Sequence, residues 1–122
     1  MDQRVKKPVK AAALPLAAVY VMLAIGPGDR HGYAIMSEIK RITKGSVQMG
    51  PGTLYGTIKR LLANGLIEER KHLQDVQRGN RRRRYYRLTA LGRTAVATEV
   101  EGLQSLLQRS GARTWALGHD TS

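Results

Sequence analysis

The chain has 122 residues, of which 21 are lysine or arginine and 9 are aspartate or glutamate, and it contains no cysteine. This length builds one domain with a modest core, and the formal net charge of +12 indicates an anionic partner, with nucleic acid the leading candidate. The lack of cysteine excludes disulfides, a thiolate nucleophile and cysteine-based zinc sites, which is typical of a reducing compartment and favours the cytoplasm.

The N-terminal segment combines a basic arm, residues 1–13, with an apolar run over residues 14–25. Secretory signals share this order, but the run is shorter than the roughly 20 residues that cross a bilayer and it contains Pro15. We therefore predict a core helix that ends at Gly26-Pro27-Gly28. A helical period places these residues on its apolar stripe: Leu16, Val19, Tyr20, Leu23 and Ile25.

Residues 29–45 show the pattern of a second, amphipathic helix. Asp29 is available as its N-cap and Gly45 as its stop. The two faces separate cleanly. The apolar face carries Ile35, Met36, Ile39 and Ile42, and the polar face carries Glu38, Lys40, Arg41 and Lys44.

The segment MGPGTLYGTIKRLLANGL, residues 49–66, places a tight turn directly before a third predicted helix. Pro51 suits its first turn, where a missing N–H costs no hydrogen bond. Apolar residues recur at helical spacing at Leu54, Ile58, Leu61 and Leu62. The outer side is left with Thr53, Gly56, Thr57, Lys59 and Arg60.

After Gly65 the pattern changes to two short extended runs around a polar loop, which predicts a β-hairpin with a basic tip. Tyr85 and Tyr86 point to opposite faces of such a strand. One of the two therefore belongs to the core, and the sequence leaves open which.

Thr89 can cap a fourth helix over residues 90–109, and we expect the remaining tail, residues 110–122, to be flexible. In a single copy, each large apolar side chain of this helix left in water would cost roughly 1.5–3 kcal/mol. We therefore predict a partner helix on one side. The predicted dimerisation residues are Leu91, Val96, Val100, Leu103 and Leu107, with Ala95 on the same side.

Three helices followed by a hairpin is the order of a winged helix-turn-helix. The predicted fold is mostly α with a small β-hairpin: a DNA-binding domain over residues 14–89 and a C-terminal dimerisation helix over residues 90–109. Because the major groove of duplex DNA admits one α-helix, the third helix is the recognition helix. The predicted DNA contacts are Tyr33, Gly52, Thr53, Tyr55, Gly56, Lys59 and Arg60 on the helices and Arg81, Arg82, Arg83 and Arg84 on the wing.

Some of these residues also fit structural roles. Tyr55 can pack between helix and wing, and Tyr33 can pack rather than contact a phosphate. The run Arg81–Arg84 can be a solvated edge, although four adjacent like charges repel one another unless an anion is near. Trp115 lies in the tail, where packing is favoured over stacking on an aromatic ligand.

Three blocks, HGYAIMSEI, GPGTLYGTIKRLLANGLIEE and RRYYRLTALGR, resemble the signature segments of the PadR family of transcriptional regulators. The likeness covers roughly residues 14–108, and the short chain is similar to the family's compact subclass. It implies a homodimer formed by the last helix with help from the first, on a pseudo-palindromic DNA operator. It also implies a repressor released by a small, often aromatic effector near Tyr20 and Leu107.

No catalytic residue, metal site or cofactor is predicted. His31, His72 and His119 are scattered without metal-ligand spacing, and the glycine-rich segments GPGDRHG and GPGT lack the pattern of a phosphate-binding loop. Two other classes remain: an arginine-rich RNA or non-specific nucleic-acid binding protein, and a protein-interaction adaptor, which the charge disfavours.

Overall fold

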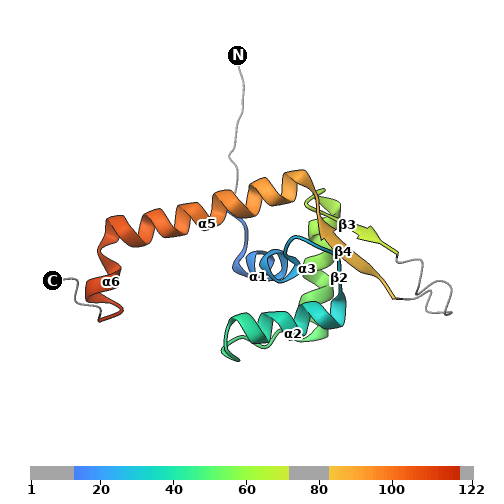
Figure 1. The fold of residues 1–122 in the computed structure, drawn as a ribbon, viewed down its shortest axis with the longest axis horizontal. Helices are drawn as coiled ribbons and strands as arrows, with labels where there is room; N and C mark the ends of the chain where they lie inside the picture. Colours follow the sequence, from blue (N-terminus) through green and yellow to red (C-terminus); the bar gives the residue numbers. More distant parts are fainter. Residues whose placement is uncertain (1–12, 72–82, 119–122) are drawn as a thin grey trace, which may run out of the picture.

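The computed structural model describes residues 13–71 and 83–118. Its elements follow the order of a winged helix-turn-helix, so the predicted mostly helical fold with a small β-hairpin is confirmed (Figure 1). They are α1 (Leu16–Ile25), β2 (Arg30–His31), α2 (Gly32–Ile42), α3 (Pro51–Ala63), β3 (Ile67–Arg70), β4 (Tyr85–Leu88), α5 (Ala90–Ser110) and α6 (Ala112–Trp115).

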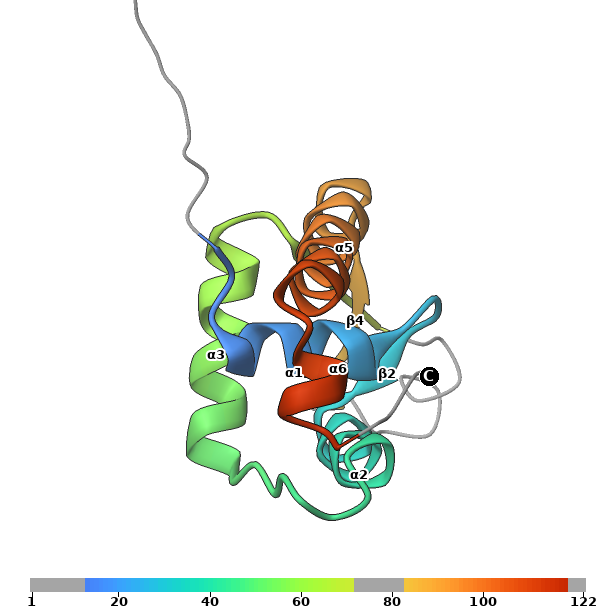
Figure 2. The same ribbon diagram turned by 90° about the vertical axis from the view of Figure 1, so that its left-hand side faces the viewer.

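The two ends of the molecule differ. Figure 1 shows the β3–β4 hairpin leaving on the side where α2 begins, while α5 and α6 extend to the opposite side. Figure 2 shows α1 crossing the centre, with α5, α3 and α2 around it. The helical layer and the wing therefore share one core, and the far half of α5 projects from it.

Helix α1 is the centre of the core, but the predicted stripe is only partly correct. Val19 and Ile25 are buried and Tyr20 is half-buried, whereas Leu16 and Leu23 are 59% and 45% exposed. Four residues outside the predicted stripe are buried instead: Ala18, Val21, Met22 and Ala24. The reason is that the helix LAAVYVMLAI has no polar residue to mark an outer face, so its period alone selects none.

A third strand, β2, was not predicted. Its two residues pair antiparallel with β4, Arg30 opposite Tyr86 and His31 opposite Tyr85, in the sheet order β2-β4-β3. The predicted N-cap of the second helix is therefore wrong: the chain at Asp29 has not yet reached α2. His31 is the N-cap, and its Nδ1 accepts a hydrogen bond from the Ala34 N–H at 3.3 Å.

Helix α5 begins at the predicted cap. The Thr89 side chain accepts a hydrogen bond from the Gly92 N–H at 3.0 Å and donates one to the Gly65 carbonyl at 2.7 Å. Gly92 lies against the backbone of Leu66. The first turn of α5 is thus fixed to the segment between α3 and β3.

The predicted tail begins with a short helix that the sequence did not indicate. Gly111 adopts a left-handed conformation, φ +70°, which turns the chain into α6. Ser110 Oγ accepts from the Ala112 N–H at 3.2 Å, and the Trp115 indole N–H donates to the Ser110 carbonyl at 3.0 Å. Residues 112–115 of the predicted tail thus form a short helix, and the flexibility expected of residues 110–122 stays a prediction; residues 119–122 lie outside the described part of the chain.

Candidate nucleic-acid interface

The outer side of α3 carries exposed small and basic residues. Its inner side packs Leu54, Ile58 and Leu61 into the core. Exposed on the outer side are Gly52, Thr53, Tyr55, Lys59 and Arg60, and Gly56 is half-buried. This face combines hydrogen-bond donors with little side-chain bulk, which lets a helix backbone approach a groove closely.

Thr57 does not belong to the outer side, where it was predicted. It is buried, and its Oγ1 donates a hydrogen bond to the Thr53 carbonyl at 2.8 Å. Because this bond to the preceding turn satisfies the hydroxyl, threonine is tolerated in the core at little cost. The Arg60 guanidinium donates to the Thr57 hydroxyl oxygen at 3.4 Å.

The first turn of α3 suits an anion. Gly50 occupies the N-cap position, no side chain caps the helix, and Pro51 follows. A helix N-terminus without a side-chain cap offers N–H groups and the positive end of the helix dipole to a phosphate. No side chain in GPGT caps these N–H groups.

Tyr33 lies in the first turn of α2 and is 70% exposed. That exposure fits a contact with a bound partner better than a packing role. Gly32, directly before it, is buried.

The wing carries arginines, but part of their charge is paired. Arg83 and Arg84 are exposed, and Arg84 Nη1 lies 2.8 Å from Glu69 Oε2 on the neighbouring strand. Arg87 Nε lies 3.2 Å from Glu68 Oε2. Arg81 and Arg82 lie outside the described residues.

The tyrosine pair of β4 is now assigned. Tyr86 is 4% exposed and belongs to the core. Burial is the main cause that raises the pKa of the Tyr86 hydroxyl above 10.0, and Glu69 and Tyr55 add to it. Tyr85 is half-buried and meets the His31 ring edge-to-face, with 5.5 Å between the ring centres.

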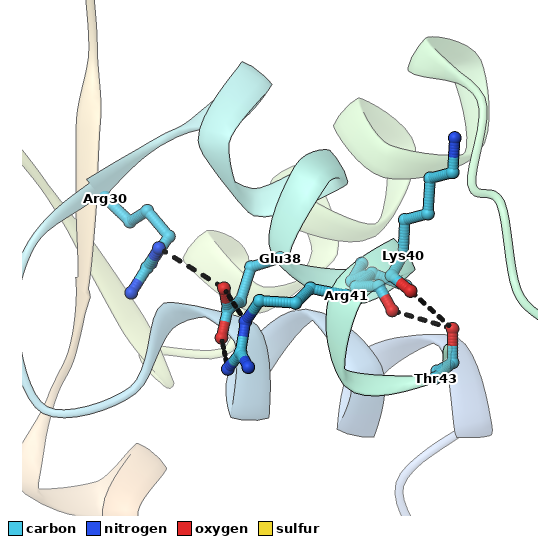
Figure 3. A network of polar contacts seen from close by, with 6 residues as sticks. Arg30, Glu38, Lys40, Arg41 and Thr43 are labelled. Atoms are coloured by element: carbon cyan, nitrogen blue, oxygen red, sulfur yellow. Dashed lines mark hydrogen bonds and ion pairs between the residues drawn. The ribbon is translucent and has the colours of Figure 1, made fainter. Parts of the chain in front are cut away.

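A carboxylate on α2 gathers two arginines (Figure 3). Glu38 accepts hydrogen bonds from Arg41 Nε at 2.9 Å and Arg41 Nη2 at 2.6 Å, and Arg30 Nη1 lies 3.8 Å away. The hydrogen bonds from Arg41 are the main cause that lowers the pKa of the Glu38 carboxyl. The i,i+3 spacing of Glu38 and Arg41 is visible in the sequence, whereas the pairing with Arg30 depends on β2.

The apolar side of α5 divides into two halves. Val96 is buried and Val100 is partly buried against the core. The prediction that both would lie in water in a single chain is therefore wrong, because the near half of α5 covers α1. Beyond it, Leu103 is 48% exposed and Leu107 is half-buried.

Leu91 lies outside that apolar side. At 3.6 residues per turn it is rotated by about 140° from Val96, and it is exposed. On the far half of α5, the large apolar side chains that are exposed are Leu103 and Leu106.

The two residues predicted for an effector lie on different helices, Tyr20 on α1 and Leu107 on α5. Leu107 lines an open hollow of about 570 Å³ between α5 and α6, whose lining does not include Tyr20. Tyr20 instead packs against the core from α1. The other lining residues are Glu101, Gln104, Ser105, Gln108 and Arg113.

Metal-binding clusters and membrane-spanning helices are both absent from residues 13–71 and 83–118. That part of the chain holds no cluster of three or more His, Asp or Glu placed to bind a metal ion. Nor does it hold a helix with the length and apolar content needed to cross a membrane.

Comparisons with known proteins agree with the geometry. The model of the transcriptional regulator PadR-like family matches residues 21–98. Transcriptional regulator Rv3488 of Mycobacterium tuberculosis is 33% identical, over 84% of this chain and 91% of that protein. A transcriptional regulator from Clostridium thermocellum superposes with a TM-score of 0.62 at 26% identity, over 79% of this chain and 86% of that one.

Other relatives are longer than the part they share with this chain. An uncharacterized protein of Lysinibacillus sphaericus is 38% identical over 60% of the chain, which spans 64% of that protein. A protein in transposon TN4556 of Streptomyces fradiae is 32% identical over 76% of the chain, which spans 24% of it.

Proposed function

The chain belongs to the PadR-like family of transcriptional regulators, and from this premise we propose that it binds a specific sequence of duplex DNA as a homodimer. The observation that carries the proposal is the outer face of α3. There Lys59 and Arg60 stand exposed beside the small residues Gly52, Thr53 and Gly56. A helix of this kind enters the major groove and presents donors to base edges and phosphates.

The wing and the start of α2 supply contacts to the DNA backbone. Arg83 and Arg84 lie directly before β4 with exposed side chains, and Tyr33 stands exposed at the first turn of α2. Such contacts fix the register of a protein on the duplex and are independent of base sequence. Arg81 and Arg82 are proposed to continue the wing contact.

The far half of α5 is the proposed dimer surface. Leu103, Leu106 and Leu107 form its apolar part, beyond the half that covers α1. Leu16 and Leu23 of α1 are exposed as well and supply a second apolar strip for the partner copy. Two recognition helices in a two-fold dimer then face half-sites about 10 bp apart, or a multiple of this.

Regulation is proposed to be repression released by a small aromatic effector. The hollow beside Leu107 is lined by α5 and α6 without Tyr20, and we propose that the partner copy completes an effector site that contains both residues. An effector lowers DNA affinity only if it prefers a dimer whose recognition helices no longer match the half-site spacing. A regulator of this kind acts in the cytoplasm, where the chromosome is.

Selection from a pool of random duplexes by the purified protein, followed by sequencing, tests the proposal. We expect enrichment of one pseudo-palindromic sequence, called the selected duplex below. Binding without enrichment would contradict sequence-specific regulation.

Competition between the selected duplex and a structured RNA at fixed salt separates the alternative of an RNA or non-specific binder. A DNA regulator retains the duplex in an excess of RNA. Preference for the RNA, or equal loss to scrambled duplex, would favour the alternative.

A further inference from the structure

Tyr55 of α3 lies directly over Gly32, the first residue of α2. A Cβ atom added at Gly32 would stand 2.2 Å from Tyr55 Oη, 2.8 Å from Cζ and 3.0 Å from Cε1. Real Cβ atoms do not approach other atoms so closely, so every residue except glycine would displace the phenol. Tyr55 is nevertheless 46% exposed.

The contact sits where three elements meet. His31, which precedes Gly32, caps α2 through Ala34 and stands edge-to-face on Tyr85 of β4. Tyr55 is also among the groups that act on the hydroxyl of Tyr86, the next residue of β4. The ring of Tyr55 therefore touches the start of α2 close to the root of the wing.

We propose that Tyr55 is a positioning residue, whose ring rests on Gly32 and fixes the orientation of α3 relative to α2 and the wing, rather than a residue that contacts a base edge. The inference rests on the proposed function and changes the role of one predicted DNA contact. Tyr55 acts on DNA through the side chains that α3 presents, chiefly Lys59 and Arg60.

The chemistry of the contact supports this role. The atoms nearest to Gly32 are the hydroxyl and its end of the ring, the part with which a tyrosine in the groove would meet a base. Held there, that end is turned toward α2. A tyrosine side chain has only two torsions. Holding its hydroxyl end against Gly32 therefore also holds helix α3, with little loss of side-chain entropy.

The first test examines the contact without DNA. Aromatic ring currents shift the NMR signals of protons that lie over a ring, so the Gly32 α-protons report the position of Tyr55. We expect a displaced Gly32 signal in the wild type and in Tyr55→Phe, and loss of this displacement in Tyr55→Leu. Equal Gly32 signals in all three proteins would overturn the contact, whatever the protein does with DNA.

The second test measures base discrimination. Each base pair of the selected duplex is changed in turn, and affinities are compared between wild type, Tyr55→Phe and Tyr55→Leu. If Tyr55 contacts one base, its replacement removes discrimination at that one base pair. For a good contact the affinity ratio at that position falls on the order of 10-fold or more. A positioning residue reduces discrimination at several positions together.

We expect Tyr55→Leu to bind the selected duplex about 10-fold more weakly, with flattened discrimination across the half-site. Tyr55→Phe keeps the ring over Gly32 and should lose at most about threefold. Loss of discrimination at a single base pair in either variant would overturn the proposal.

The matched glycine variants complete the test. Gly32→Ala pushes out the flexible end of Tyr55 and should reproduce the Tyr55→Leu profile, while adding nothing to Tyr55→Leu itself. Gly28→Ala meets no atom within 4 Å and should bind as the wild type does. Additive losses in the Gly32→Ala/Tyr55→Leu double variant would contradict action through this contact.

A wild type that enriches no sequence would refute the proposed function and with it the role in discrimination. The Gly32 signal would still decide separately whether the ring holds the two helices together.

Discussion

At the scale of one residue, Gly92 lets the first turn of α5 approach the backbone of Leu66 closely. A Cβ atom at this position would stand 1.9 Å from the Leu66 carbonyl oxygen and 2.9 Å from its carbon. Both are backbone atoms, which cannot swing aside as the end of a side chain can. The first turn of α5 therefore requires glycine here, whatever the cost of glycine to the helix.

Gly92→Ala should accordingly lower the free energy of unfolding by about 1–3 kcal/mol, the range typical of overpacking. Gly102→Ala is the matched control on the same helix, because nothing lies within 4 Å of its added Cβ. The control should gain up to about 1 kcal/mol from helix propensity. Thermal and urea denaturation measure both, and equal effects of the two variants would contradict the close approach.

Glu38 gives a pH-dependent prediction. Its pKa lies below the ordinary 4.5, mainly through the hydrogen bonds from Arg41. A lowered pKa in the folded state stabilises the fold above pH 4.5, and this stabilisation is lost as the pH falls through the folded-state pKa. Glu38→Gln should therefore melt below the wild type at pH 7, and the two curves should converge in acid.

Arg41→Gln supplies the control, since it removes the main cause of the shift. In that background Glu38→Gln should have a smaller effect on the melting temperature. A difference between wild type and Glu38→Gln that stays the same from neutral pH into acid would exclude the ion pair as its source.

At the scale of the elements, the DNA contact proposed for the wing competes with ion pairs to its own acidic residues. Arg83 and Arg84 are exposed, but Glu69 already holds Arg84 at 2.8 Å. Exposed ion pairs of this kind contribute little to stability. Removing the two arginines should therefore lower DNA affinity and leave the fold intact.

Replacing Arg83 and Arg84 by alanine should weaken selected and scrambled duplex alike and lower the salt slope by about 0.9 for each phosphate that the wing no longer neutralises. Glu69→Gln frees Arg84 and should strengthen binding to both duplexes. Lys44→Ala, at an exposed site beyond the end of α2, controls for net charge. Titrations over a salt series measure these slopes, and an unchanged slope in the double variant would remove the wing from the interface.

The sequence predicted those elements whose pattern contains both polar and apolar residues. Helices α2 and α3 alternate the two classes and were predicted, although α2 begins at Gly32 and its cap is His31 rather than Asp29. The Thr89 cap and the two strands of the hairpin were predicted as well. Helix α1 contains only apolar residues, so its buried face is selected by what packs around it. Strand β2 has two residues, too few for any period, and exists only because β4 pairs with it.

The candidate site was predicted in composition but not in its contacts. The exposed face of α3 follows from helical spacing, except for Thr57, whose burial depends on a hydrogen bond to its own helix. The approach of Tyr55 to Gly32 joins two helices, and no local pattern contains it. The Leu103–Leu107 surface required knowing where α5 stops covering α1.

At the scale of the whole molecule, the proposed homodimer depends on the far half of α5. Leu103→Asp places a charge on the proposed dimer surface without touching the core and should give monomers that bind the selected duplex weakly. Leu91→Asp is the matched control, exposed on the same helix but in its first turn, far along the axis from Leu103, and should remain dimeric. Light scattering and DNA titration measure both, and a dimeric Leu103→Asp protein with full affinity would exclude this surface.

The central claim, that the outer face of α3 recognises a DNA sequence, is tested most directly by the ratio of affinities for selected and scrambled duplex in Lys59→Ala. Lys44→Ala, the same substitution at an exposed site beyond the end of α2, controls for charge. We predict that Lys59→Ala lowers the ratio by about 5- to 150-fold, equivalent to about 1–3 kcal/mol, and that Lys44→Ala leaves it unchanged. An equal loss on both duplexes in Lys59→Ala would contradict the claim.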